Sequence, residues 1–127
     1  MAIRVLLAED SECVRRGIGQ VLSSQDGIEL VGESTDFSQT IRLANELQPE
    51  VIVMDLHVPD ETKITSRDFR SHVNLGTRLV AISFWNDEPS QQLAESFGAA
   101  VLLDKMGLGE TLIPTIVQLC RERGVAA

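Results

Sequence analysis

Aromatic, cysteine and basic residues are scarce in this chain of 127 residues. It has no tyrosine and one tryptophan, and its two cysteines, Cys13 and Cys120, make neither a disulfide framework nor a metal cluster. Lysine and arginine number 11 against 19 acidic residues, and the net charge of −8 argues against binding nucleic-acid phosphates. No apolar run approaches the roughly 18 residues of a membrane span, and the N-terminus lacks a signal-peptide pattern. We therefore expect a soluble, cytoplasmic domain that binds neither nucleic acid nor membrane.

Apolar residues make up 43% of the chain, enough for one core, so we expect a single domain over residues 1–127. Short apolar runs rich in valine, isoleucine and leucine alternate with amphipathic stretches. Such runs are typical of strands that are buried on both faces of a parallel sheet. The predicted strands are residues 3–8, 28–32, 51–54, 79–82 and 100–103. The second run keeps some alternation, which favours a place near an edge.

Helical spacing of apolar residues separates these strands. Ser11 is a candidate N-cap for the first helix, and Pro89 and Gly98 are candidates for the start and end of a later one. The predicted helices are residues 12–22, 37–47, 64–73, 89–97 and 112–120, the third being the weakest pattern. Pro114 conflicts with the last helix and requires either a late start or a kink. The alternation predicts an α/β fold, a doubly wound five-stranded parallel sheet with five helices.

Chemically active side chains follow four of the predicted strands. In a doubly wound sheet, ligands bind at the carboxyl ends of the strands near the point where the strand order reverses. We therefore expect three carboxylates, a hydroxyl and an ammonium to meet at one edge of the sheet. They belong to Glu9, Asp10, Asp55, Ser83 and Lys105.

Three clustered carboxylates repel one another, and a divalent cation relieves that repulsion. A site of oxygen ligands that keeps several waters suits Mg²⁺. A carboxylate beside such a metal can attack a phosphoryl group, and phosphoryl transfer needs mainly positioning and charge neutralisation. The residues therefore favour a phosphoryl acceptor over a general acid–base site.

Four stretches place these candidates in one ordered pattern, namely Leu6–Ser11, Val53–Pro59, Ala81–Ser83 and Gly98–Lys105. In this order they resemble the response-regulator receiver domain, which has the CheY-like fold, and the resemblance covers essentially the whole chain. The residues after the first strand, Asp10–Gly17, are also similar to receivers of the LuxR/NarL branch, which usually precede a helix-turn-helix DNA-binding domain.

The resemblance implies a role for each candidate. Asp55 corresponds to the phosphoacceptor that a histidine kinase phosphorylates, Ser83 to the switch hydroxyl and Lys105 to the paired lysine. Glu9 and Asp10 correspond to the acidic pair that holds Mg²⁺, and Asp55 with the backbone carbonyl of His57 completes the metal ligands. The expected function is signalling, with self-catalysed phosphorylation and slow self-dephosphorylation and no enzymatic turnover.

The chain departs from the family pattern at several positions. Leu102 stands where an aromatic switch residue is common, and Phe84 and Trp85 follow the switch hydroxyl, where a small residue is usual. Core packing and an exposed interaction surface are equally open for these two aromatics. Met106 replaces a common proline, and the residues after Pro59 lack the usual glycine.

Other functions remain to be weighed. A haloacid-dehalogenase-type phosphohydrolase needs an aspartate where His57 stands, and a cobalamin-binding module needs a glycine where Asp60 stands. A degenerate receiver that acts through protein contacts without phosphorylation is the main alternative. Apolar positions on the last helix permit a homodimer but equally fill a core.

Overall fold

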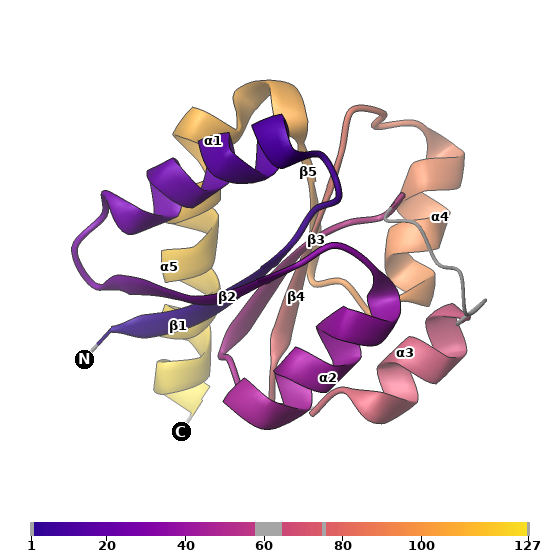
Figure 1. The fold of residues 1–127 in the computed structure, drawn as a ribbon, viewed down its shortest axis with the longest axis horizontal. Helices are drawn as coiled ribbons and strands as arrows, with labels where there is room; N and C mark the ends of the chain where they lie inside the picture. Colours follow the sequence, from indigo (N-terminus) through magenta and orange to yellow (C-terminus); the bar gives the residue numbers. More distant parts are fainter. Residues whose placement is uncertain (1, 58–64, 75, 127) are drawn as a thin grey trace.

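The structure is a computed structural model that describes residues 2–57, 65–74 and 76–126, the last five in backbone only. Strands and helices alternate along the described chain (Figure 1). The strands are Ile3–Ala8 (β1), Ile28–Ser34 (β2), Val51–Asp55 (β3), Arg78–Ser83 (β4) and Val101–Asp104 (β5). The helices are Glu12–Ser23 (α1), Phe37–Leu47 (α2), Ser66–His72 (α3), Glu88–Ser96 (α4) and Leu108–Ala126 (α5), and a short 3-10 turn, Lys105–Gly107 (η1), precedes α5.

The five strands form one parallel sheet in the order β2-β1-β3-β4-β5. This confirms the predicted doubly wound α/β class with five strands and five helices, and it places β2, the strand with residual alternation, at an edge. The chain order reverses between β1 and β3, so the connections after these two strands leave in opposite directions and open a crevice at their carboxyl ends. Residues that directly follow β1 and β3 are therefore neighbours.

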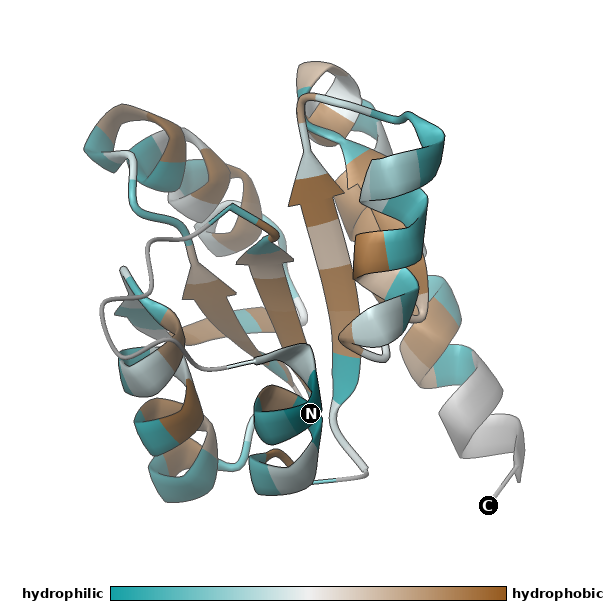
Figure 2. Cartoon of the chain, turned by 90° about the vertical axis from the view of Figure 1, so that its right-hand side faces the viewer, coloured by the Kyte–Doolittle hydropathy of each residue, from teal (hydrophilic) through white to brown (hydrophobic). Residues whose placement is uncertain are grey.

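The core lies in two layers, one on each face of the sheet. Within β1, Val5 and Leu7 pack with α1 and α5, whereas Leu6 and Ala8 pack with α2, α3 and α4. Successive side chains of a strand point to opposite faces, so a strand covered on both sides is apolar throughout. Figure 2 shows this directly, because the strands are brown along most of their length while the helices carry teal stretches.

Local signals set the helix ends close to where the sequence predicts them. The Ser11 hydroxyl accepts a hydrogen bond from the Val14 N–H at the start of α1. Asp87 caps α4 with Pro89 in its first turn, and Gly98, with φ of 79°, follows the helix end. A positive φ strains any residue with a Cβ atom, which explains a glycine at this position.

Helix α5 corrects one prediction. It begins at Leu108 and includes Pro114, so of the two alternatives the late start is wrong and the kink stays a prediction. Leu108 and Leu112 are buried against the sheet, and their packing outweighs the proline. Pro114 has no N–H for the carbonyl of Glu110, but Glu110 is exposed, so water can take that place. Among the described residues, neither α5 nor any other helix is long and apolar enough to span a membrane.

Helix α3, the weakest prediction, is present and short. Thr65 and Asp68 form a reciprocal capping box at its start. Phe69 is fully buried, and its ring contacts the rings of Phe37 and Phe97. Tertiary packing therefore holds a helix that is too short to be stable alone. Residues 58–64, which include the predicted positions Pro59, Asp60 and Ile64, lie outside the described residues.

Candidate functional site

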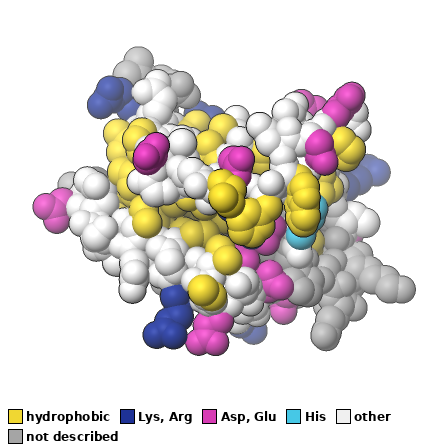
Figure 3. Space-filling model, turned by 90° about the horizontal axis from the view of Figure 1, so that it is seen from above, with side chains coloured by type: hydrophobic (Ala, Val, Ile, Leu, Met, Phe, Trp, Pro, Cys, Tyr) yellow, Lys and Arg dark blue, Asp and Glu magenta, His cyan; other side chains and the backbone are white. Residues whose placement is uncertain are grey.

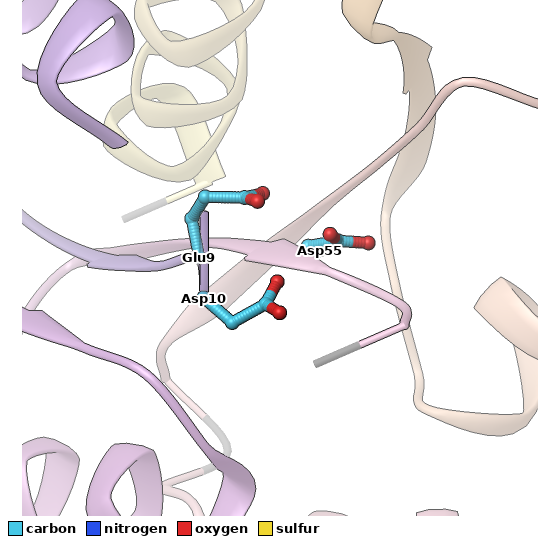
Figure 4. A group of neighbouring side chains, drawn as sticks. All are labelled: Glu9, Asp10 and Asp55. Atoms are coloured by element: carbon cyan, nitrogen blue, oxygen red, sulfur yellow. The ribbon is translucent and has the colours of Figure 1, made fainter. Parts of the chain in front are cut away.

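The carboxylates at the carboxyl ends of β1 and β3 point into the same space. Glu9 and Asp10 come from the turn after β1, and Asp55 is the last residue of β3 (Figure 4). One oxygen from each of the three side chains lies within 4.8 Å of the others. They border a hollow of about 280 Å³, the acidic pocket, which is lined by Glu9, Asp10, Ser11, Val14, Asp55, His57, Phe84, Trp85 and Lys105. The structure thus brings together residues that are more than forty positions apart in the sequence.

Lys105, the first residue after β5, bridges two of these carboxylates. Its Nζ lies 2.8 Å from Oδ2 of Asp55, to which it donates a hydrogen bond, and 2.9 Å from Oε2 of Glu9. All three side chains are nearly inaccessible, with at most 7% of their surface exposed. A buried charge without a partner would be strongly destabilising, so each of these groups depends on the others. Asp10, in contrast, is exposed and opens the pocket to solvent.

Burial affects the pKa values of both Glu9 and Lys105. It raises the pKa of the Glu9 carboxyl above the ordinary value of 4.5, the negative charge of Asp55 adds to this, and the Lys105 ammonium opposes it. Burial alone would lower the pKa of Lys105, but its hydrogen bonds and charge interactions with Asp55 and Glu9 outweigh burial and raise it. Lys105 is therefore charged at neutral pH, whereas Glu9 keeps a proton to higher pH than an exposed glutamate does.

The donor set fits a hard divalent cation. Oε2 of Glu9 is buried and pairs with the Lys105 ammonium at 2.9 Å, while Oε1 accepts a hydrogen bond of 3.2 Å from the Ser11 N–H. Each carboxylate oxygen has two lone pairs, so the three clustered carboxylates can accept a cation in addition to the lysine. Oxygen ligands with one side open to water are what Mg²⁺ prefers. Glu9, Asp10 and Asp55 could therefore hold a metal ion, and the identity of that ion stays a prediction.

His57 and Ser83 lie beside the carboxylates in different ways. The backbone N–H of His57 donates to Oδ1 of Asp55 at 2.9 Å, which orients the carboxylate, and the predicted metal contact of the His57 carbonyl stays a prediction. Ser83 ends β4 and is buried. Its hydroxyl accepts a hydrogen bond of 3.0 Å from the Trp85 N–H, so it is engaged within its own loop.

Phe84 and Trp85 are exposed, by 49% and 58%, which settles the open choice against core packing. The Lys105 ammonium lies 4.9 Å from the centre of the Phe84 ring, and the Trp85 ring packs edge-on against His57 at 5.3 Å. The space-filling view shows hydrophobic side chains beside carboxylates and a histidine on one face of the molecule (Figure 3). Sequence reasoning missed these contacts, although the position of both aromatics directly after a strand end was a usable signal.

Leu102, where an aromatic is common in the family, lies in β5 and is half-buried. It lines a shallow hollow together with residues of α4, among them Gln91 and Glu95. The aromatic side chain that switches in many receivers is therefore absent at this position, and the predicted switching depends on Ser83 and Lys105.

A five-stranded parallel α/β domain with a carboxylate cluster where its strand order reverses is the architecture of a CheY-like receiver domain. The model of the response regulator receiver domain family matches residues 5–116, and the chain belongs to that family.

Curated relatives and solved structures agree with this assignment. The response regulator GacA of Pseudomonas viridiflava is 32% identical over 111 residues, which is 85% of this chain and 51% of GacA. The transcriptional regulatory protein LiaR of Bacillus subtilis is 54% identical over 54 residues, 42% of this chain and 26% of LiaR. The receiver domain of NarL from Mycobacterium tuberculosis superposes with a TM-score of 0.81 at 22% identity, covering 94% of this chain and 97% of that one. The chain spans about half the length of GacA, and the resemblance to the LuxR/NarL branch is confirmed.

Proposed function

We propose that this receiver domain takes a phosphoryl group from a phosphohistidine of a sensor kinase onto Asp55. The observation that carries the proposal is the placement of a buried carboxylate at the end of β3, between a lysine and two further carboxylates. This arrangement positions an acceptor and supplies positive charge on one side and metal ligands on the other. Phosphoryl transfer requires these two things above all.

The transfer is a substitution at phosphorus. An Asp55 carboxylate oxygen forms the new P–O bond, and the P–N bond to the kinase histidine breaks. The electron pair leaves on the imidazole nitrogen, which takes up one proton from solvent, so that the histidine leaves as neutral imidazole. The Lys105 ammonium lies 2.8 Å from Oδ2 of Asp55 and is placed to neutralise charge on the transferring group. Bound Mg²⁺, held by the three carboxylates and the His57 carbonyl, would supply Lewis-acid neutralisation of the phosphoryl oxygens.

Phosphorylation adds up to two negative charges to the acidic pocket. Lys105 then pairs with the phosphoryl group, and the Ser83 hydroxyl exchanges its bond to the Trp85 N–H for one to a phosphoryl oxygen. Both changes shift the population between two packings of the loops after β4 and β5. The surface around α4 and β5 is the output that a partner reads.

Membership of the family supports the proposed setting. The partner is a histidine kinase, the compartment is the cytoplasm, and the chain signals without enzymatic turnover apart from slow self-dephosphorylation. Residues 1–127 form the receiver unit. Phosphorylation changes either the surface of the receiver, which a partner or a second copy of the receiver binds, or a DNA-binding domain in the same protein. The receiver itself contacts no nucleic acid.

Intact mass measured after incubation with acetyl phosphate and Mg²⁺ tests the acceptor. We expect one phosphoryl adduct in the wild type and none in Asp55→Asn. Asp36→Asn is the matched control, because it removes a carboxylate from the α2 N-cap while asparagine still caps the helix, and we expect it to match the wild type. An equal adduct in Asp55→Asn would show that the acceptor is wrong. No adduct in the wild type favours the degenerate receiver.

A further inference from the structure

Arg15, on the first turns of α1, makes two contacts away from its own helix. Its Nη1 donates to the backbone carbonyl of Glu9 at 3.0 Å, and its Nε lies 3.8 Å from Oε1 of Glu33 on β2. Its side chain is 20% exposed, whereas that of the neighbouring Arg16 is 77% exposed and pairs with Glu12 of the same helix. Two adjacent arginines therefore differ sharply in what they touch.

The carbonyl that Arg15 binds lies at the point where β1 leaves the sheet. The N–H of Glu9 still donates to the Ser34 carbonyl of β2, at 3.0 Å, but the Glu9 carbonyl lies beyond the strand pairing. Glu9 is buried, so an unpaired carbonyl would be costly, and Arg15 supplies its partner. The backbone of Glu9 is thus held on both sides, by β2 and by α1.

The peptide group between Glu9 and Asp10 determines the directions of both carboxylates. In a continuing strand, Glu9 and Asp10 would point to opposite faces of the sheet. Here both carboxylates lie within 4.8 Å of an Asp55 oxygen and point into the same space, because the chain bends between them (Figure 4). The carbonyl bound by Arg15 belongs to the peptide group that joins these two residues, so its orientation controls where both carboxylates point.

Helix energetics alone do not favour an arginine here. A cation near a helix N-terminus interacts unfavourably with the helix dipole. The planar guanidinium, however, presents several donors in a fixed fork and can contact a carbonyl and a carboxylate at once, which a lysine ammonium does less well. The first turns of α1 are also part of the segment that resembles the LuxR/NarL branch, and the proposed phosphotransfer gives Arg15 no role of its own.

We infer that Arg15 is a positioning residue for the metal site, holding the Glu9–Asp10 peptide so that both carboxylates face Asp55. This rests on the proposed function, in which these carboxylates hold Mg²⁺. Removing Arg15 leaves the ligands present but lets the turn relax. Partners that orient ligands without touching the metal typically change metal affinity by about 10–100-fold.

Calorimetric titration with Mg²⁺ alone tests this inference, with the fluorescence of Trp85, the only tryptophan, as a second readout from the pocket edge. We expect Arg15→Gln to raise the Kd for Mg²⁺ about tenfold. Arg15→Lys keeps the positive charge but loses the planar set of guanidinium donors, so we expect its Kd to lie between those of Arg15→Gln and the wild type. Arg16→Gln, the matched control, leaves the Kd unchanged.

The alternatives give different results. A wild type that binds no Mg²⁺ contradicts the proposed function, whereas a wild type that binds and an Arg15→Gln variant that binds equally contradicts only the role of Arg15. If Arg15→Lys equals the wild type while Arg15→Gln is weak, the residue acts as a charge and positions nothing. A lower urea midpoint with an unchanged Kd would show a purely structural role. Where Arg15→Gln does not fold, the Kd of Arg15→Lys decides.

Discussion

At the scale of single residues, Glu9 combines a carboxylate charge with almost complete burial, and burial disfavours the ionised form. Its carboxylate is 1% exposed, its Oε2 pairs with the Lys105 ammonium at 2.9 Å, and burial raises its pKa. A metal binds only the deprotonated carboxylate, so protons and Mg²⁺ compete for this group. If the site holds Mg²⁺ as proposed, its metal affinity rises as Glu9 loses its proton.

We predict that Mg²⁺ affinity falls as the pH is lowered from neutral toward 4.5. The pH range in which affinity is lost lies above 4.5, the ordinary pKa of a glutamate. The reason is that the pKa of Glu9 is raised, so that Glu9 becomes protonated at a higher pH. Calorimetric titration at several pH values measures this. Glu9→Gln should bind more weakly at neutral pH and lose less affinity on acidification. A wild-type affinity that stays constant down to pH 4.5 would contradict the competition.

The sequence was a good guide to which residues meet and a poor guide to how they touch. Each of these residues lies at the carboxyl end of a strand, and the geometry of parallel sheets brings strand ends together whatever the side chains do: Asp55 ends β3, and Glu9, Asp10 and Lys105 follow β1 or β5. The packing of Phe84 on Lys105 depends on side-chain directions after the strand has ended, where no periodicity constrains them. The contact of Arg15 with a backbone carbonyl leaves no trace in a pattern of residue types.

At the scale of elements, predictions succeeded where one residue marks an end. Ser11 and Gly98 mark their helix ends by hydrogen bonding and by positive φ, and both were predicted. The start of α5 was missed because Gly109 and Pro114 are unfavourable in helices, whereas the burial of Leu108 depends on the whole fold. Helix α3 was a weak prediction for the same reason, since its stability comes from the packing of Phe69.

We predict that Phe69→Ala lowers the free energy of unfolding by about 3–5 kcal/mol, because it removes a fully buried ring that joins α3 to α2 and α4. Phe84→Ala is the matched control, since the same atoms are removed from a ring that is 49% exposed, and we expect a loss of less than about 1 kcal/mol. Urea denaturation measures both. Equal losses would mean that α3 is not held by this cluster.

At the scale of the whole molecule, the distribution of charge matters more than its total. The net charge of −8 is spread over 127 residues, but three carboxylates share one pocket, with Lys105 bridging two of them. Such a cluster opposes folding in the absence of a cation, because like charges repel at short range. This unfavourable cluster lies where the strand order reverses. Ligands bind at that place in such folds, so a bound cation can neutralise the repulsion.

We predict that Mg²⁺ stabilises the folded domain, by about 2.7 kcal/mol when its concentration is about 100 times the Kd. Urea denaturation with and without MgCl₂ measures the gain, and NaCl at equal ionic strength controls for general screening of the acidic surface. Asp10→Asn should lose most of the gain. It should also leave the metal-free domain as stable as the wild type or more so, because it removes one repelling charge from an exposed position. An equal gain with NaCl, or a full gain in Asp10→Asn, would show that Mg²⁺ acts by screening the whole surface and not by filling the pocket at the end of β1 and β3.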